Sequence, residues 1–271
     1  MNRRRAKALG QHFLKNPLIL KKIVHTIRPQ ESDLIIEIGP GKGALTFPLA
    51  TKAGQVIAIE KDSALAAFLQ KKDLSNLTVL EADILKVDFK KLIEKDTWEA
   101  VKLVGNLPYS ISSPLLFRII EEKDLFSECV FLFQKEFAER ICAQPGTKKY
   151  APLSILFQIY FLTRLHFFVS PDSFSPPPRV ESALISLQKR EKPLFQLEEE
   201  AFLKFLKKAF QHRRKTLFNN LTRLPYPPPL LREAFHKFGL TNSLRPEQLT
   251  ISQLVSLYQF LMEKPKKVKY P

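Results

Sequence analysis

The stretch Glu37–Gly43, with the sequence EIGPGKG, decides the fold. It follows a short apolar run, Leu34–Ile38, that predicts a buried strand, and it leads into an amphipathic stretch near Ala44–Ala53 that predicts a helix. Glycines between a strand and a helix let the backbone turn tightly and approach a ligand closely. A strand, a glycine loop and a helix in this order predict an α/β fold with a ligand-binding loop.

Short β-rich runs alternate with helical patterns in the first part of the chain. This alternation predicts a mainly parallel sheet with helices on both faces, and the last strand, which follows Pro176–Pro178, could enter antiparallel. The expected strands are Leu34–Ile38, Gln55–Glu60, Leu77–Glu81, Val101–Gly105, Cys129–Phe133 and Ser182–Gln188. The helical stretches between them lie near Ala44–Ala53, Ser63–Lys72, Pro114–Glu122 and Lys135–Ala143.

The pattern changes beyond Arg190. Helices are expected at Glu198–Gln211, Leu230–Phe238 and Ile251–Glu263, and residues 191–271 hold 15 Lys and Arg against 7 Asp and Glu. We therefore expect two domains: residues 1–190 bind a cofactor and catalyse, and residues 191–271 form a basic helical domain with a disordered Lys-rich tail.

The overall charge predicts a polyanionic partner. The chain has 43 Lys and Arg against 27 Asp and Glu, a net charge of +16, which suits nucleic acid or an anionic membrane surface. Its longest apolar stretch, Leu153–Leu162, is too short to span a bilayer, and no apolar region follows the basic N-terminus. Cys129 and Cys142 lack disulfide-framework or metal-ligand spacing. We expect a cytoplasmic nucleic-acid-binding protein with no membrane segment and no metal site.

Acidic residues near the glycine loop favour a cationic cofactor. A dinucleotide fold has the fingerprint G-x-G-x-x-G, but here the third Gly comes one place early and Glu37 precedes the loop. That carboxylate would repel a pyrophosphate and attract the ammonium and sulfonium of S-adenosylmethionine. Glu60 ends the second strand, where a carboxylate can hold ribose hydroxyls, and Asp83 follows the third strand, where it can accept from an adenine amino group. Together they predict the broad class of S-adenosylmethionine-dependent methyltransferases.

The segment Asn106–Tyr109, with the sequence NLPY, suits the chemistry of an exocyclic amine. Such an amine is a poor nucleophile, because its lone pair is delocalised into the base. The Asn106 side-chain oxygen and the next carbonyl can hold its two N–H groups and favour a pyramidal nitrogen, while Pro108 stiffens the turn. Tyr109 offers a face on which a flipped-out base can stack, typically worth about 1–3 kcal/mol. Taken alone, the segment suits a strand-ending turn equally well.

Several segments in order then carry a resemblance to a known family. They are Lys7–Leu14, Glu37–Thr46, Asn106–Tyr109, Phe133–Arg140, Phe174–Ala183 and Arg213–Leu217. Together they resemble the rRNA adenine N6,N6-dimethyltransferases of the KsgA family, which modify small-subunit rRNA, over nearly the whole chain. His12 stands where Asn is frequent in that family, and Ala151 stands where Gly is usual.

The resemblance implies a fold and a role for each matched residue. The fold is a Rossmann-like seven-stranded methyltransferase sheet with helices on both faces, plus a small all-helical C-terminal domain. S-adenosyl-L-methionine would contact His12, Leu14, Glu37, Gly39, Gly41, Glu60, Asp83 and Asn106. The catalytic residues would be Asn106, Leu107, Pro108, Tyr109 and Phe174, with the two aromatic rings sandwiching the target adenine. Arg213, Arg214 and Lys215, on a basic helix, would bind RNA phosphates.

The implied activity is dimethylation of two adjacent adenosines in the 3′-terminal hairpin of 16S rRNA. The partner would be the pre-30S subunit during ribosome biogenesis, bound by a monomer. A large-subunit rRNA methyltransferase of the antibiotic-resistance type has a similar core, but the basic helical domain and Arg213–Leu217 argue against it. Restriction-type DNA methylation is less favoured, since no separate sequence-reading domain is apparent. A non-catalytic assembly factor on the same fold is disfavoured by the intact Glu37–Gly43 loop and Asn106–Tyr109 segment.

Overall fold

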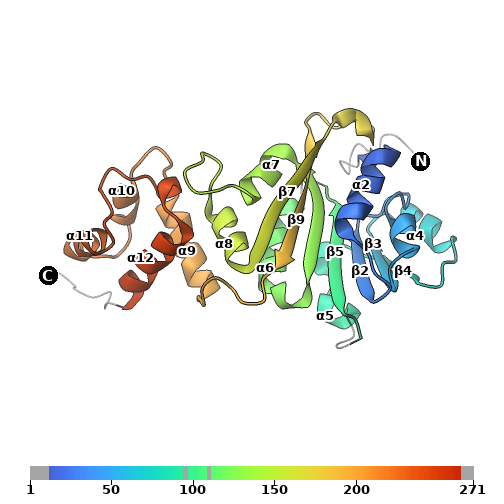
Figure 1. Ribbon diagram of the computed structural model, residues 1–271, viewed down its shortest axis with the longest axis horizontal. Helices are drawn as coiled ribbons and strands as arrows, with labels where there is room; N and C mark the ends of the chain where they lie inside the picture. The colour runs from blue at the N-terminus through green and yellow to red at the C-terminus, as the bar shows by residue number, and fades with distance from the viewer. Residues whose placement is uncertain (1–11, 94–96, 109–110, 264–271) are drawn as a thin grey trace. The chain divides into compact units, whose positions relative to one another are not determined.

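One seven-stranded sheet organises the first part of the protein. The structure is a computed structural model that describes residues 12–93, 97–108 and 111–263 (Figure 1). The strands are β2 (Asp33–Ile38), β3 (Gln55–Glu60), β4 (Leu77–Glu81), β5 (Ala100–Asn106), β6 (Glu128–Gln134), β7 (Phe161–Val169) and β9 (Ser182–Lys189). Their order is β4-β3-β2-β5-β6-β9-β7, and β9 runs antiparallel to both of its neighbours. This confirms the expected α/β fold and the antiparallel entry of the last strand.

The strand order creates a switch point between β2 and β5. These two strands pair in parallel, and the chain continues from β2 toward β3 and β4 on one side and from β5 toward β6 on the other. The connections therefore diverge at the carboxyl ends of β2 and β5. In open α/β sheets, this divergence opens a crevice in which ligands bind.

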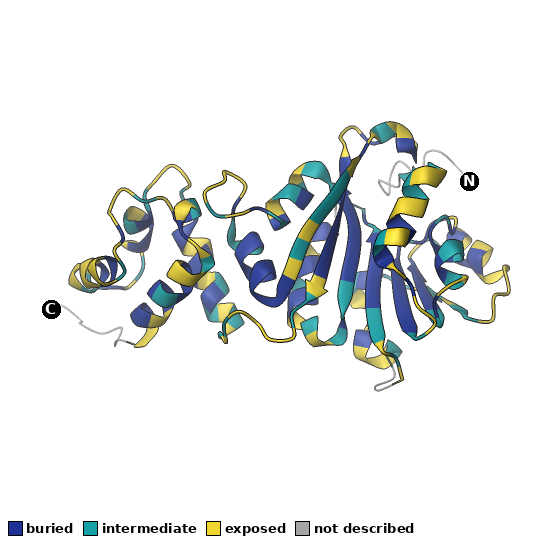
Figure 2. Cartoon of the chain, viewed as in Figure 1, coloured by how far each residue is buried: buried dark blue, intermediate teal, exposed yellow. Residues whose placement is uncertain are grey.

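Helices cover both faces of the sheet. Every residue of β2 is buried, which requires cover on each side, and Figure 2 shows the same for the central strands. The helices of this part are α2 (Pro17–Ile27), α3 (Thr46–Ala50), α4 (Ser63–Gln70), α5 (Phe89–Leu92), α6 (Ser112–Glu121) and α7 (Lys135–Ile141). On one face, Ile23, Val24 and Ile27 of α2 share a core cluster with Ile35 of β2 and Val104 of β5.

Two compact units emerge from the contacts along the chain. The first comprises residues 1–139 and 161–190, and the second comprises residues 140–160 and 191–271. Residues 140–160, which the sequence analysis placed in the first domain, thus group with the helical part. The second unit contains α8 (Pro152–Tyr160), α9 (Glu199–Ala209), α10 (Leu217–Leu221), α11 (Pro228–Lys237) and α12 (Ile251–Glu263). None of the helices in the described parts of the chain is a candidate membrane span.

The sequence pattern does not reveal α8 or β7. The chain passes from α8 to β7 without an intervening turn, so one apolar run contains both elements. Residues 154–160 are all buried, which removes the polar face by which a helix is normally recognised. Helix α2 was not predicted either, although it has two sequence signals of a helix start: Asn16 accepts from the backbone N–H groups of Leu18 and Ile19, and Pro17 occupies the first position.

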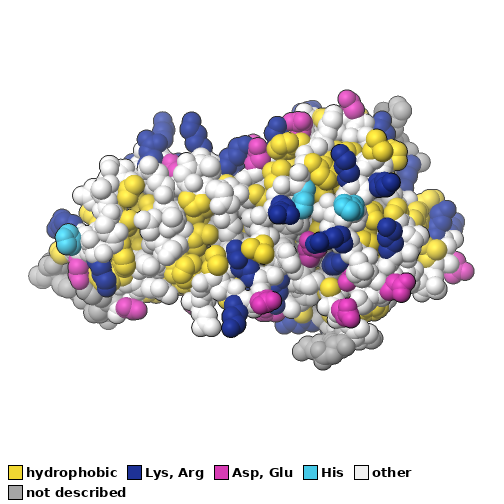
Figure 3. Space-filling model, in the orientation of Figure 1, with side chains coloured by type: hydrophobic (Ala, Val, Ile, Leu, Met, Phe, Trp, Pro, Cys, Tyr) yellow, Lys and Arg dark blue, Asp and Glu magenta, His cyan; other side chains and the backbone are white. Residues whose placement is uncertain are grey.

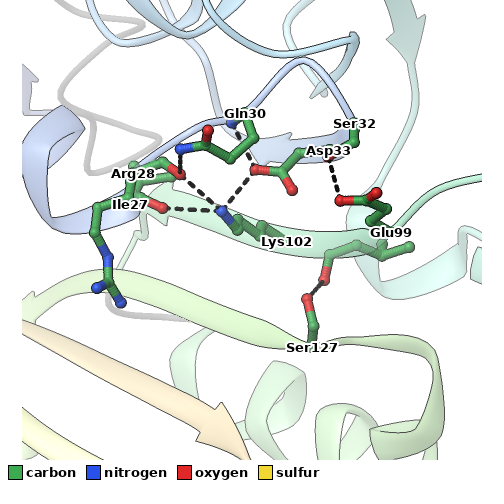
Figure 4. Close-up of polar contacts among 9 residues, drawn as sticks. Ile27, Arg28, Gln30, Ser32, Asp33, Glu99, Lys102 and Ser127 are labelled. Carbon is green, nitrogen blue, oxygen red and sulfur yellow. Dashed lines mark hydrogen bonds and ion pairs between the residues drawn. The ribbon is translucent and has the colours of Figure 1, made fainter.

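A buried ion pair fixes α2 against the two central strands (Figure 4). Lys102 Nζ, on β5, lies 2.6 Å from Asp33 Oδ2 on β2, and both side chains are almost fully buried. The same ammonium donates to the carbonyls of Ile27 at 3.2 Å and Arg28 at 3.0 Å, at the end of α2. All three ammonium protons therefore have acceptors, and the positive charge lies at the negative end of the helix dipole.

Replacing Lys102 by Ala should destabilise the protein strongly. It would leave the Asp33 carboxylate buried and unpaired, which typically costs about 3–5 kcal/mol of unfolding free energy. Lys189→Ala is the matched control, because Lys189 Nζ lies 2.7 Å from Asp124 Oδ1 in an exposed pair. Its loss should change stability by about 1 kcal/mol or less. Urea unfolding of the variants tests this, and equal destabilisation by both substitutions would contradict the structural role of Lys102.

Candidate active site

A cavity of about 500 Å³ opens at the carboxyl ends of the central strands. Its lining comes from residues 12–15, 37–42, 59–62, 82–84, 105–108 and 174–175, among others. These segments follow β2, β3, β4 and β5 or lie beside them, as the switch-point rule requires. The cavity therefore brings together the N-terminal motif, the glycine loop, the carboxylates and the Asn106–Pro108 segment.

The three glycines of the loop have different structural roles. Gly39, Gly41 and Gly43 all adopt positive φ, at 65°, 59° and 81°. A Cβ on Gly41 would come within 2.9 Å of the Phe13 ring, and one on Gly43 within 2.5 Å of the Phe47 ring, so these positions serve packing. A Cβ on Gly39 would meet nothing within 4 Å. Gly39 thus borders open space in the cavity, where a ligand can approach the backbone.

Glu37 is a buried carboxylate without a full set of partners. Its Oε2 atom makes no hydrogen bond among the described residues. The nearby Thr46 hydroxyl favours the ionised form of Glu37, but Thr46 Oγ1 also makes no hydrogen bond there. Burial raises the pKa of Glu37 to about 7, and the nearby Glu60 carboxylate acts in the same direction. A ligand ammonium would satisfy this group, so the site fits a cationic amino-acid moiety.

Glu60 and Asp83 are held in fixed orientations at the next two strands. Glu60 accepts from the backbone N–H of Gly41 at 3.1 Å and from that of Asp62 at 2.9 Å, and burial raises its pKa. Asp83 pairs with Lys61 at 2.8 Å and accepts from the Leu85 N–H at 3.1 Å. The Lys61 hydrogen bond lowers the pKa of Asp83, so this carboxylate is ionised at neutral pH. Each therefore presents oriented acceptor oxygens at the cavity.

Asn106 is anchored by the N-terminal motif. Its Nδ2 donates a 2.8 Å hydrogen bond to the carbonyl of His12, and no described residue donates to its Oδ1. His12 Nδ1 in turn lies 2.8 Å from the carbonyl oxygen of Pro176. Beside it, β1 (Phe13–Leu14) pairs antiparallel with β8 (Phe174–Ser175). The motif thus joins the end of β5 to the proline-rich loop, and it leaves the amide oxygen of Asn106 available to a substrate.

The backbone at Leu107 and Pro108 is held by hydrogen bonds to neighbouring segments. Leu107 is buried and donates from its N–H to Leu132 O at 3.3 Å, while Pro108 O accepts from Ile111 N at 3.2 Å. Within the described part of the chain, nothing donates to the Leu107 carbonyl. Tyr109 lies outside the described residues, as do residues 7–11 of the N-terminal motif.

Phe174 packs in the core. Its side chain is 1% exposed, and it belongs to the same apolar cluster as Leu14, its partner across β1 and β8. It also lines the cavity. Any base that stacks on it must therefore reach the ring from the cavity side.

The prediction of a basic helix at Arg213–Lys215 is wrong. These residues form a turn between α9 and α10, because Thr216 caps α10 by accepting from Asn219 N and so starts the helix after the basic run. Arg213 donates to the carbonyls of Lys148 at 2.6 Å and Tyr150 at 3.2 Å. Arg214 and Lys215 are exposed, and their side chains have no hydrogen-bond partner in the described structure. Arg213 therefore shapes the turn, and its two neighbours are the cations that face solvent.

Arg118 is a positioning residue that the sequence analysis did not identify. From α6 it donates to the carbonyls of Ile84 and Val87, each at 2.7 Å. It thereby fixes the segment that follows Asp83. No local pattern marks it, since a single Arg on an amphipathic helix is ordinarily a surface residue.

Comparison with known proteins decides the family. The family described as "Ribosomal RNA adenine dimethylase" matches residues 2–263. The chain belongs to this family. A Streptococcus pneumoniae protein, ribosomal RNA small subunit methyltransferase A, is 42% identical over 260 residues, which cover 93% of this chain and 90% of that protein.

Solved structures agree with this assignment. A dimethyladenosine transferase from Plasmodium falciparum has a TM-score of 0.79 at 30% identity and covers 91% of this chain and 96% of its own. The 23S rRNA methyltransferase ErmE has a TM-score of 0.73 at 25% identity, covering 92% of this chain and 99% of its own. The resemblance stated from the motifs is confirmed. Members of the family use S-adenosyl-L-methionine, and the acidic cavity fits that cofactor.

Glu37→Gln should make ligand-free stability less dependent on pH. Because the folded pKa of about 7 exceeds the ordinary value of 4.5, the contribution of Glu37 is complete below about pH 4.5 and is lost as pH rises through 7. The neutral amide avoids this loss. At about pH 8 the ligand-free variant should exceed wild type by up to roughly 3 kcal/mol, and near pH 4.5 the two should be equal.

The same substitution should weaken cofactor binding, because it removes the negative charge that faces the ammonium. Calorimetric titration with S-adenosylmethionine and urea unfolding across this pH range provide both measurements. A variant with unchanged affinity, or with the pH profile of wild type, would contradict the assigned role of Glu37.

Proposed function

We propose that this protein transfers methyl groups from S-adenosyl-L-methionine to N6 of two adjacent adenosines in the 3′-terminal hairpin of small-subunit (16S) rRNA. The product is N6,N6-dimethyladenosine, formed during ribosome biogenesis. The observation that carries the proposal is the orientation of Asn106, whose amide nitrogen is held by His12 and whose oxygen remains available at the cavity. The names of the bacterial relative and of the Plasmodium enzyme support rRNA and dimethyladenosine as substrate and product.

Asn106 and Leu107 supply the acceptors for the target amine. When bound, S-adenosylmethionine supplies an electrophilic methyl group on its sulfonium. Asn106 Oδ1 and the Leu107 carbonyl accept from the two N–H groups of N6, which favours a pyramidal nitrogen with a localised lone pair. N6 becomes acidic only as it is methylated, so no strong general base is needed. Catalysis rests on positioning and desolvation.

Tyr109 and Phe174 are proposed to sandwich the flipped adenine. Phe174 borders the cavity and is fixed by the pairing of β1 with β8, so its ring is immobilised before the base arrives. A rigid aromatic wall loses little entropy when a base stacks on it. Dimethylation requires that the same site also accept the monomethylated base.

The RNA-binding role falls on Arg214 and Lys215 in the second unit, with Arg213 holding their turn in shape. The proposal includes a pre-30S subunit as the partner, a monomeric enzyme and a cytoplasmic location. The high net charge of +16 supports a polyanionic partner.

A second candidate is methylation of large-subunit rRNA. The specific observation in its favour is the TM-score of 0.73 with ErmE, a 23S rRNA methyltransferase. Labelled methyl transfer to isolated small and large subunits separates the two candidates.

Asn106→Ala should lower methyl transfer to unmethylated small subunits by about 10²–10³-fold, the usual effect of losing one catalytic hydrogen-bonding group. Subunit binding should stay within a few-fold of wild type. Because Asn106 also holds His12, cofactor affinity is measured in parallel and should fall far less than transfer does. Asn242→Ala, at an exposed Asn, is the control. Equal loss of subunit binding and methyl transfer would contradict the catalytic role assigned to Asn106.

The double substitution Arg214→Ala and Lys215→Ala should weaken subunit binding. The slope of log K against log salt concentration should become shallower by roughly 1–2, about one for each lost phosphate contact. Cofactor affinity and thermal stability should not change. Arg213→Ala should in addition lower stability, because it frees the carbonyls of Lys148 and Tyr150. An unchanged salt slope in the double variant would argue against phosphate binding by this turn.

A further inference from the structure

A second basic surface lies on the catalytic unit, over α2 and β7. Lys21, Lys22 and Arg28 of α2 and its C-cap, together with Arg164 of β7, are exposed, and we call them the α2/β7 face. Residues 17–28 and 161–169 contain no Asp or Glu. Figure 3 shows Lys, Arg and His side chains gathered over these two elements.

The two elements form one continuous surface. Lys22 Nζ lies 5.7 Å from the centroid of the Phe167 ring, a contact that joins α2 to β7. His166, on β7, has its Nε2 atom 2.8 Å from Ser186 Oγ of β9, and burial together with the positive charges of Arg164 and Arg28 lowers its pKa. The lowered pKa favours the neutral form of the His166 ring, so Lys and Arg carry the fixed charge of the face.

Three of the four cations of this face have no acidic partner among the described residues. No described carboxylate forms an ion pair with Lys21, Lys22 or Arg164, whereas Lys135 and Lys189 elsewhere in this unit have acidic partners. Like charges on adjoining elements repel one another, so the face is electrostatically unfavourable without a counter-charge. The position of the cations is best explained by an anionic partner.

The face leads to the cavity. Helix α2 starts shortly after Leu14, and β7 ends shortly before Phe174, so both elements converge on the β1–β8 pair at the cavity. Leu20 and Ile23 of α2 line the cavity itself, while Lys21 and Lys22 point to solvent. A polyanion bound along this face would therefore pass close to Asn106.

We propose that the α2/β7 face binds the phosphate backbone of the substrate RNA next to the target adenosines, in addition to the Arg214–Lys215 turn. This inference rests on the proposed function, because it takes the substrate to be rRNA. A backbone contact of this kind positions the RNA without reading its sequence. It would hold the strand on which the flipped base is carried.

The test removes three exposed charges together: Lys21→Gln, Lys22→Gln and Arg164→Gln. Arg28 is left in place, because it caps α2 and interacts with the half-buried Glu128. The matched control is Lys52→Gln, Lys71→Gln and Lys90→Gln, which removes the same charge from exposed, unpaired positions near α3, α4 and α5, toward the opposite sheet edge. S-adenosylmethionine affinity should match wild type in both triple variants, and the free energy of unfolding should fall by no more than about 1 kcal/mol in the α2/β7 variant, from loss of the exposed contact between Lys22 and Phe167.

Binding to unmethylated small subunits is then measured over a series of salt concentrations. The α2/β7 variant should bind about tenfold or more weakly, with a log K against log salt slope shallower by roughly 2–3, while the control stays close to wild type. Methyl transfer at saturating subunits should be retained, since only docking is affected.

Equal slopes for the α2/β7 variant and the control would overturn the proposal. The proposal would also be overturned if the α2/β7 variant bound RNA like wild type but lost wild-type binding to phosphatidylglycerol vesicles. That result would make the face a lipid-binding surface. Wild-type methyl transfer, measured on the same subunits, tests the proposed function separately. If transfer occurs and the salt slopes do not differ, only the assignment of this face fails.

Discussion

The Asn106 side chain donates a 2.8 Å hydrogen bond to the carbonyl of His12, and this contact determines which atom of the amide is left for the substrate. Four residues earlier on the same strand, Lys102 holds the carboxyl end of α2. Residues four apart on a strand lie on one face of the sheet, which is the face that α2 covers through Val104. Strand β5 therefore holds both His12 and the end of α2, and these contacts set the geometry of the cavity.

Three carboxylates at the cavity differ in how they are held, and their environments separate their roles. Asp83 is ionised and paired with Lys61. Glu60 accepts a hydrogen bond from the backbone N–H of Gly41 and so helps to hold the glycine loop. Glu37 has an oxygen without a partner and a pKa of about 7. The ligand-free protein can therefore leave Glu37 protonated, and a cationic ligand can restore its charge. The cofactor's cation thus completes a polar site that the fold alone leaves unsatisfied.

Much of this architecture could be predicted from sequence, because local patterns carry it. The strand ranges of β3 and β4 were predicted without error, since each has β-rich residues bounded by polar ones. The glycine loop and the carboxylates after successive strands identified the cofactor class, because parallel strands bring such positions to one edge. The α8–β7 junction could not be found, because an apolar run has no period that separates a buried helix from a strand.

Contacts between distant segments were also out of reach. The bond from Asn106 to His12 spans 94 residues, and that from His12 to Pro176 spans 164. The role of Arg213 depends on carbonyls 63 and 65 residues earlier in the chain, so its sequence neighbours suggested only a basic helix. Such pairings are set by tertiary packing, and only the motif resemblance brought their residues together in advance.

The most direct test of the central claim is nucleoside analysis of rRNA after transfer of labelled methyl groups from S-adenosylmethionine, with unmethylated small subunits and large subunits assayed side by side. The account predicts N6,N6-dimethyladenosine in small-subunit rRNA, at two adjacent positions, and no label in the large subunit. Label confined to large-subunit rRNA, or a methylated nucleoside other than N6,N6-dimethyladenosine as the end product, would contradict it.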